Sequence, residues 1–111
     1  MTAIEGFYRA EFMTPEHHGF GVLAIAGGTA RGGDSIMSYV GSCDCSGGDV
    51  TLDLEVCRHS HLGQMQPIFK TDCCTLCITG KQIDGGRIAG TGHSPEAPDI
   101  PFKLILTKLR D

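Results

Sequence analysis

The feature that most constrains this chain is a period of two in its apolar residues, the period of a β-strand. Residues 49–57 show it most clearly, because Val50, Leu52, Leu54 and Val56 alternate with polar residues and a cysteine. We find no stretch of ten residues with the 3.6-residue period of an amphipathic helix. The sequence therefore predicts an all-β protein with little helix.

Eight segments carry strand signals, and glycine pairs or Asp-Gly separate several of them. Glycine supplies the positive φ that tight hairpins need. Residues 59–72 and the proline-rich residues 94–101 are predicted to be irregular. This pattern predicts one antiparallel barrel or sandwich over residues 1–111, and a barrel would close its own edges. The predicted strands are residues 4–13, 20–26, 29–31, 36–42, 49–57, 73–79, 87–93 and 100–109.

Charge and hydropathy narrow the function classes. The net charge of the 111 residues is −4 and no run of basic residues occurs, which argues against direct binding of nucleic acid. The first residues lack the pattern of a signal peptide, and no apolar run is long enough to span a membrane. We therefore expect a cytoplasmic protein, in which the six cysteines stay reduced rather than forming three disulfides.

The motifs give no sign of an enzyme. Residues 27–34, GGTARGGD, lack the lysine of a phosphate-binding loop and lie between two predicted strands. We find no nucleophile elbow, no zinc-protease motif and no marked pair of carboxylates. The sequence predicts no catalytic site and no cofactor.

Residues 57–77 contain four cysteines and two histidines. On a strand Cys74 and Cys77 point to opposite faces, so they cannot hold one zinc ion together. Cys74 is predicted to be a core residue. If the two strands are neighbours, an outer cluster could form from Cys57, His59, His61, Cys73 and Cys77. A metal site or a thiol sensor there remains an alternative to the favoured interpretation, two strands that carry thiols.

Three further groups of residues are candidates for binding. Residues 43–49 are predicted to form a polar hairpin loop, with Asp44 and Asp49 available to a protein partner. In the last strand Ile105 and Leu109 lie on the face opposite Phe102, which suggests a homodimer interface. Barrels of this size can hold one small ligand. The aromatic residues that could line its cavity are Tyr8, Phe12, Phe20 and Phe102.

The order of glycine and aromatic residues resembles the GrlR-like family, negative regulators of type III secretion. The matching segments are EGFYRAEF, GFGVLAIAGGTARGGD and YVG, at residues 5–12, 19–34 and 39–41. The resemblance implies an eight-stranded, lipocalin-like barrel that dimerises and sequesters a transcriptional activator without contacting DNA. The family's best-known member reaches its activator through a run of four alternating acidic residues in the loop after Tyr-x-Gly. This chain lacks that run and has only Asp44 and Asp49 there.

Three functions follow from these observations. The first is a non-catalytic regulatory protein that binds a transcriptional activator. The second is a carrier of a small hydrophobic ligand inside the barrel. The third is a sensor based on a metal or on thiols.

Overall fold

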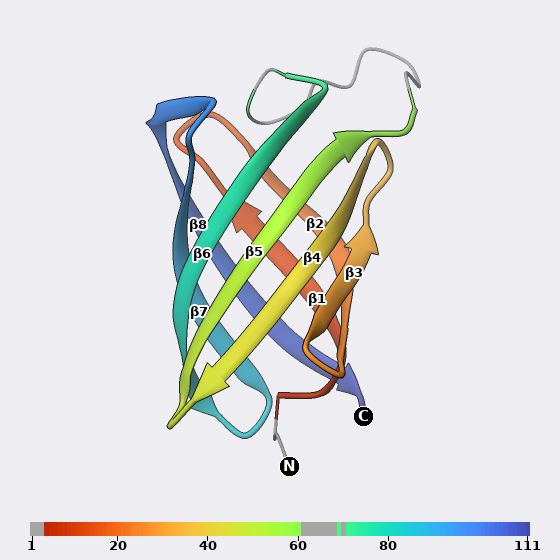
Figure 1. Cartoon of the computed structure of the whole chain (residues 1–111), viewed down its shortest axis with the longest axis vertical. Coiled ribbons are helices and arrows are strands. Elements are labelled where there is room, and N and C mark those ends of the chain that lie inside the picture. Colours follow the sequence, from red (N-terminus) through yellow and green to blue (C-terminus); the bar gives the residue numbers. More distant parts are fainter. Residues whose placement is uncertain (1–3, 61–68, 70) are drawn as a thin grey trace.

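The computed structural model describes residues 4–60, 69 and 71–111. These residues form a closed antiparallel barrel of eight strands, which confirms the fold class predicted from the sequence (Figure 1). Each strand pairs with the next along the chain, and β8 pairs with β1 to close the barrel. The strands are β1 (Gly6–Met13), β2 (His18–Ala26), β3 (Thr29–Gly33), β4 (Met37–Ser46), β5 (Asp49–Arg58), β6 (Cys73–Asp84), β7 (Arg87–Ser94) and β8 (Ala97–Arg110).

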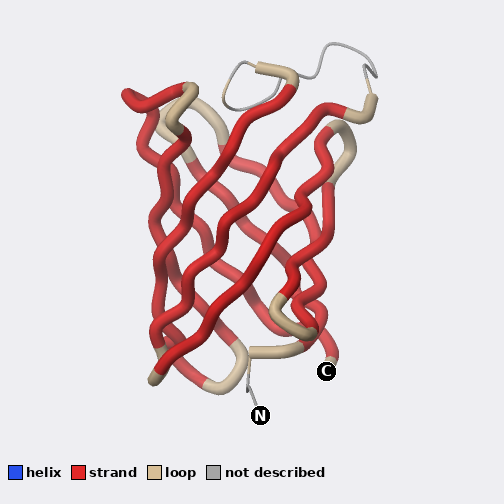
Figure 2. Tube along the Cα trace, viewed as in Figure 1, coloured by secondary structure: helices blue, strands red, loops and turns tan. Residues whose placement is uncertain are grey.

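The described part of the chain contains strands and turns but no helix (Figure 2). Consequently, none of the described residues belongs to a helix long and apolar enough to cross a membrane. Closure pairs both edges of every strand with a neighbour over at least part of its length.

The two ends of the barrel are built differently. The start of β1, the end of β8 and the turns at residues 27–28, 47–48 and 85–86 lie at what we call the lower end (Figure 1). Gly27, Gly28, Gly47 and Gly48 all have positive φ, between 59° and 92°, as the favoured two-residue hairpin turns require. The connections at residues 14–17, 34–36 and 95–96 lie at the opposite, upper end, as do the end of β5 and the start of β6.

The apolar and polar residues that alternate in the sequence face the inside and the outside of the barrel in turn. Val50, Leu52, Leu54 and Val56 of β5 point inward and are at most 5% exposed. Cys74 of β6 is buried beside Val56, its partner in the register, as the pattern predicted. Polar residues between them face outward, so one buried face per strand is enough to fill the barrel.

The lower end has a packed core. The Tyr8 hydroxyl donates a hydrogen bond of 2.7 Å to the Ile4 carbonyl, which draws residues before β1 across this end. Both residues are buried, and Leu106 of β8 is fully buried. Tyr8 was expected to line a ligand cavity, but it closes the lower end instead. Its polar hydroxyl finds a backbone partner there, as a buried tyrosine requires.

Two predicted loops are wrong, because strands continue through them. β4 runs to Ser46, so Asp44 lies on a strand and not in a hairpin loop. β8 begins at Ala97, and only residues 95–96 separate it from β7. The register pairs none of residues 98–101, with either β7 or β1. Pro98 and Pro101 are tolerated there because no ladder hydrogen bond is lost.

Candidate ligand-binding cavity

The upper end of the barrel encloses a cavity of about 230 Å³. Its walls come from inward residues of β1, β2, β4, β5, β6 and β8, and its mouth is bordered by the upper connections. Most of the wall is apolar, with Leu54, Leu76 and Leu104 on three different strands. These side chains are at most 6% exposed, so the wall is held by the core itself.

A chain of four aromatic rings runs along the cavity. Phe12 stacks on Phe102 with 6.5 Å between ring centroids, and it meets Tyr39 edge-to-face at the same separation. Phe69 lies 5.6 Å from Phe102 and is 5% exposed. All four residues line the cavity. Aromatic pairs in these geometries stabilise each other beyond their buried area, so this part of the wall is expected to be rigid.

Two glycines of β2 leave room for these rings. A Cβ atom on Gly19 would lie 2.8 Å from the Phe12 ring, and one on Gly21 would lie 2.9 Å from the Tyr39 hydroxyl. Both positions face inward, where any side chain would collide with an aromatic residue. The Gly-x-Gly element of the sequence is thus explained by the aromatic wall that faces it.

The main polar feature of the wall is the pair Tyr39 and Asp34. The Tyr39 hydroxyl donates a hydrogen bond to Asp34 Oδ2. Asp34 Oδ1 accepts hydrogen bonds from the backbone N–H groups of Ile36 (3.0 Å) and Met37 (2.8 Å). Burial, the hydrogen bond to Asp34 and its negative charge all raise the pKa of Tyr39 above its ordinary value of 10.0. Tyr39 is therefore protonated at neutral pH.

The raised pKa of Tyr39 predicts a loss of stability at high pH. Because the folded protein holds the Tyr39 proton more tightly than the unfolded chain, this contribution is complete below pH 10 and is lost as the pH rises further. We expect the urea concentration at the unfolding midpoint to decrease as the pH is raised from about 9 to about 11. The decrease should be less steep for Tyr39→Phe. Urea unfolding followed by circular dichroism measures both slopes, and equal slopes would contradict the assignment.

The remaining polar groups lie on the rim. His17 and His18 border the mouth, and His18 Nε2 is 2.7 Å from Glu11 Oε2 on the outer wall. Among the described residues that line the cavity, none is lysine or arginine. The fixed negative charge of Asp34 and the neighbouring Glu11 carboxylate therefore favour neutral or donor groups over anions at this end.

The structure separates the four aromatic candidates. Phe12 and Phe102 line the cavity. Phe20 only borders it: the side chain is 55% exposed, and its ring packs on the outside against His18 and Arg9. Its register partner is Glu11, also outward, because the inward positions on either side of Phe20 are Gly19 and Gly21. Tyr8 lies below the cavity, as described above.

Comparison with known proteins bears on the fold alone. No protein-family model matches the sequence, and no curated protein matches it either. Among solved structures, a redesigned β-barrel is similar with a TM-score of 0.64. The alignment covers 96% of this chain and 91% of that chain at 13% identity. The structural similarity supports the barrel architecture, and at so low an identity it carries no information about function.

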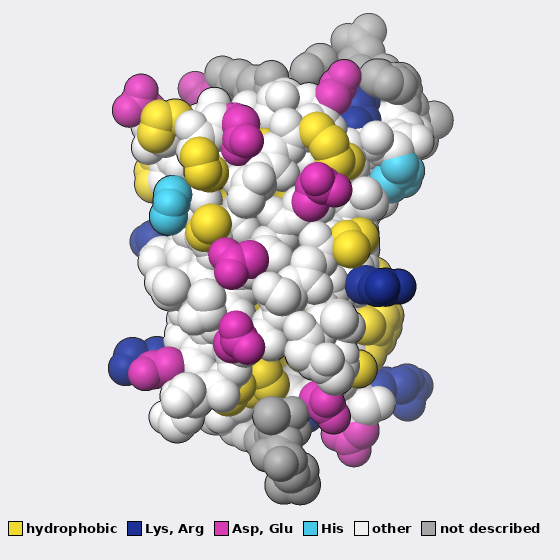
Figure 3. All heavy atoms as spheres, viewed as in Figure 1, with side chains coloured by type: hydrophobic (Ala, Val, Ile, Leu, Met, Phe, Trp, Pro, Cys, Tyr) yellow, Lys and Arg dark blue, Asp and Glu magenta, His cyan; other side chains and the backbone are white. Residues whose placement is uncertain are grey.

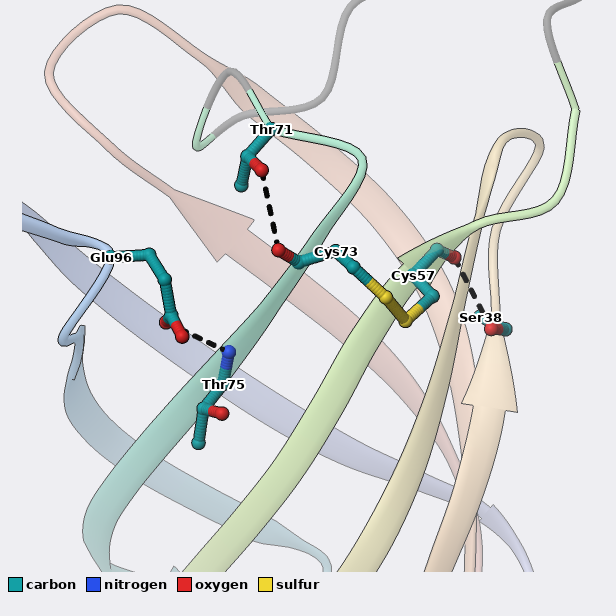
Figure 4. Close-up of a disulfide and its surroundings, with 6 residues drawn as sticks. All are labelled: Ser38, Cys57, Thr71, Cys73, Thr75 and Glu96. Carbon is teal, nitrogen blue, oxygen red and sulfur yellow. Dashed lines mark hydrogen bonds between the residues drawn. A yellow bond between two sulfur atoms is a disulfide. The ribbon is translucent and has the colours of Figure 1, made fainter.

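Two of the cysteines form a disulfide on the outer wall. Cys57 of β5 and Cys73 of β6 are register partners with their Cα atoms 4.1 Å apart, and their sulfur atoms are bonded (Figure 4). The neighbouring pair is hydrogen-bonded, since the Arg58 N–H donates to the Asp72 carbonyl. Cys57 and Cys73 therefore occupy the closer, non-hydrogen-bonded kind of pair. The expectation that all six thiols stay reduced is wrong for these two.

Reduction of this disulfide is expected to destabilise the fold. The bond joins residues 16 positions apart, and a loop of this length contributes about 3 kcal/mol in the chain-entropy account. Urea unfolding with and without a phosphine reductant measures the difference. The double variant Cys57→Ser/Cys73→Ser is the control, because it should be as stable as the reduced protein and insensitive to reductant. A native protein equally stable in both conditions would contradict the prediction.

The possible metal site does not assemble within the described residues. Cys57 and Cys73 are bonded to each other, and Cys77 lies on the outer face of β6 four register pairs below. His59 Nε2 is 3.0 Å from the Asp34 carbonyl oxygen, and His61 lies outside the described residues. The described part of the chain holds no group of three or more metal-ligating residues in suitable positions.

The outer face of β4 to β6 is acidic. Asp44 is exposed on β4, and Asp49, Asp53 and Glu55 are exposed on β5. Lys81 of β6 pairs with Asp49 at 3.2 Å. Figure 3 shows acidic side chains spread over this face, with most lysine and arginine side chains toward its edges. The two predicted partner-binding residues thus belong to a larger acidic surface rather than to a loop tip.

The outer face of β8 carries the two candidate interface residues. Leu109 is 50% exposed, while Ile105 is half-buried between Glu11 and Ala89, its register partners. We expect Ile105→Glu to weaken self-association more than it lowers the free energy of unfolding, because the side chain points away from the core. Sedimentation velocity with a parallel urea titration checks this. A monomeric native protein that loses stability on substitution would contradict it.

Proposed function

We propose that this protein binds a small apolar molecule in the upper end of the barrel. One observation carries the proposal: the lower end is filled by its own side chains, whereas the upper end leaves a cavity of about 230 Å³ between buried leucine and phenylalanine side chains. An empty cavity lowers the stability of the fold, because the atoms that line it lose favourable dispersion contacts. A pre-formed apolar cavity with few polar groups is the usual form of a small-molecule site.

The size of the cavity limits the ligand. A dry apolar cavity of about 150 Å³ accepts benzene. In proportion, a cavity of this volume accommodates about nine non-hydrogen atoms. This is below the range of about 300–1,000 Å³ typical of sites for drug-sized molecules. A medium-chain or single-ring compound fits the space, and a long-chain lipid would have to leave part of its chain outside.

Binding of 1-octanol, which has about this size, tests the proposal. A ligand that binds only the folded state stabilises it, by about 2.7 kcal/mol at a hundredfold excess over Kd. We expect 1-octanol to raise the thermal midpoint in a saturable way and to give a binding isotherm by titration calorimetry. The proposed function would be overturned if the folded protein showed no saturable response to either 1-octanol or the single-ring probe 4-ethylphenol.

A second candidate function is the regulatory binding of a protein partner. The supporting observation is the acidic outer face at Asp44, Asp49, Asp53 and Glu55, which suits a basic protein segment. The resemblance to the GrlR-like family suggests a transcriptional activator as that partner. Immobilised protein should retain an activator from an extract of its source cells, and Asp44→Lys/Asp49→Lys should release it. Retention that is unchanged by the charge reversal would contradict this surface.

A further inference from the structure

The polar group in the cavity wall has an unusual hydrogen-bonding balance. The Tyr39 hydroxyl has one proton, and that proton is donated to Asp34 Oδ2. The two backbone N–H groups bound to Asp34 Oδ1 hold the carboxylate in place on its other side. The arrangement cannot easily reverse, because a carboxylate has no proton to return. Tyr39 Oη therefore offers the cavity acceptor lone pairs and no proton.

Other polar groups along the cavity do not alter this balance. The Thr71 hydroxyl donates to the Cys73 carbonyl, and His18 is paired with Glu11 on the outer wall. Ser35 and His17 lie in the upper connections, at the mouth. The deeper residues that line the cavity are alanine, leucine, isoleucine, valine, methionine, phenylalanine and a buried cysteine. The polar recognition available inside the cavity is therefore acceptance, by Tyr39 Oη and by the Asp34 carboxylate beside it.

We infer that the cavity selects an uncharged apolar molecule that carries one hydrogen-bond donor, such as an aliphatic alcohol or a phenol, and rejects carboxylates. The donor of the ligand would bond to Tyr39 Oη while its apolar body lies among Phe12, Phe102 and Leu104. A carboxylate would bring only acceptors toward an acceptor, close to the charge of Asp34. The inference rests on the proposed function, since it names the class of ligand for the same cavity.

Three ligands of nearly equal size separate these possibilities. They are 1-octanol, which has a donor; heptyl methyl ether, its isomer without a donor; and octanoate, an anion with acceptors alone. We expect titration calorimetry at neutral pH to give 1-octanol an affinity at least about tenfold above that of the ether, the effect of one buried hydrogen bond. Octanoate should bind more weakly than both.

Asp34→Asn gives a matched test in which the polarity of Tyr39 should reverse. Asparagine Oδ1 can still accept from Ile36 and Met37, while its Nδ2 amide replaces Oδ2 and donates to Tyr39 Oη. The Tyr39 proton then turns toward the cavity. We expect the preference for 1-octanol over the ether to fall to about twofold or less, and the affinity for octanoate to rise.

The outcomes distinguish the inference from the proposed function. An alcohol preference in the native protein that is lost in Asp34→Asn supports the inference. Binding of the ether or of octanoate as tightly as 1-octanol overturns the inference and leaves the proposed function intact. If none of the three ligands binds to the folded native protein, both are overturned. The native ligand series decides these outcomes even if the variant does not fold.

Discussion

Replacing Val56 with phenylalanine is expected to lower the affinity for 1-octanol at least about tenfold, because its ring would occupy the space of the ligand. Val56 is 5% exposed and lines the cavity. It lies on β5 between its register partners Tyr39 and Cys74, at the level where the wall is aromatic. The cavity itself accommodates the added atoms, so the fold should be retained. Titration calorimetry measures the affinity, and circular dichroism confirms folding.

Val40→Phe is the matched control for this substitution. Val40 lies on the adjacent strand β4, faces outward and is 47% exposed, and its register partner is Glu55. The same change of side chain there leaves the cavity untouched and should leave the affinity for 1-octanol within about twofold. Equal loss of binding in both variants, or full binding in Val56→Phe, would show that the ligand does not occupy the cavity.

Leu106→Ala is expected to lower the free energy of unfolding by about 3 kcal/mol, the middle of the range for a leucine truncated in a packed core. Leu106 is fully buried at inward register positions opposite Ala10 and Ile88. Side chains already fill this region, so the removed atoms leave a new void that rigid strands cannot close. Urea unfolding monitored by circular dichroism measures the change.

Leu109→Ala on the same strand is the control for Leu106→Ala. Leu109 is 50% exposed on the outer wall, and its truncation should change stability by only about 0.5 kcal/mol. The pair tests whether the lower end carries the packed core of the barrel. Comparable losses for the two substitutions would contradict that account, as would a negligible loss for Leu106→Ala.

The sequence was sufficient for the architecture because alternation and turn residues are local signals. The inward set of β5 and the positive φ at Gly27 and Gly47 follow directly from the residues at those positions. Local signals did not predict where β4 ends and where β8 begins. Residues 43–46 are polar, yet β4 includes them because β5 reaches far enough to pair with them. Ala97 belongs to β8 because it pairs with Ser94 of β7, and the strand continues through Pro98 and Pro101 without register partners.

The candidate site was less accessible to sequence reasoning. Phe12 and Phe102 could be assigned to the cavity because the alternation in their strands places them on the inward face. Phe69 could not, because it lies in a segment without a strand period. The hydrogen bond between Tyr39 and Asp34 joins two residues of the segments that resemble the GrlR-like family. Their contact depends on the turn at residues 34–36. A signal existed in Gly19 and Gly21, whose missing side chains leave room for large residues opposite them.

The disulfide illustrates the same limit. The sequence placed Cys57 and Cys73 on the outer face of two strands, and a bond between them was possible only if those strands were neighbours in one particular register. The structure supplies that register, in which the two residues are direct partners. A shift of one residue would have separated them and turned one thiol toward the core.

The most direct test of the central claim is a titration of methyl-labelled protein with 1-octanol, followed by ¹³C–¹H correlation NMR. Leucine methyl groups report from every level of the barrel. The account predicts saturable shifts at Leu54, Leu76 and Leu104, which line the cavity, and much smaller shifts at Leu52 and Leu106, which do not line it. Shifts confined to exposed Leu109, or no saturable shift at any leucine, would contradict it.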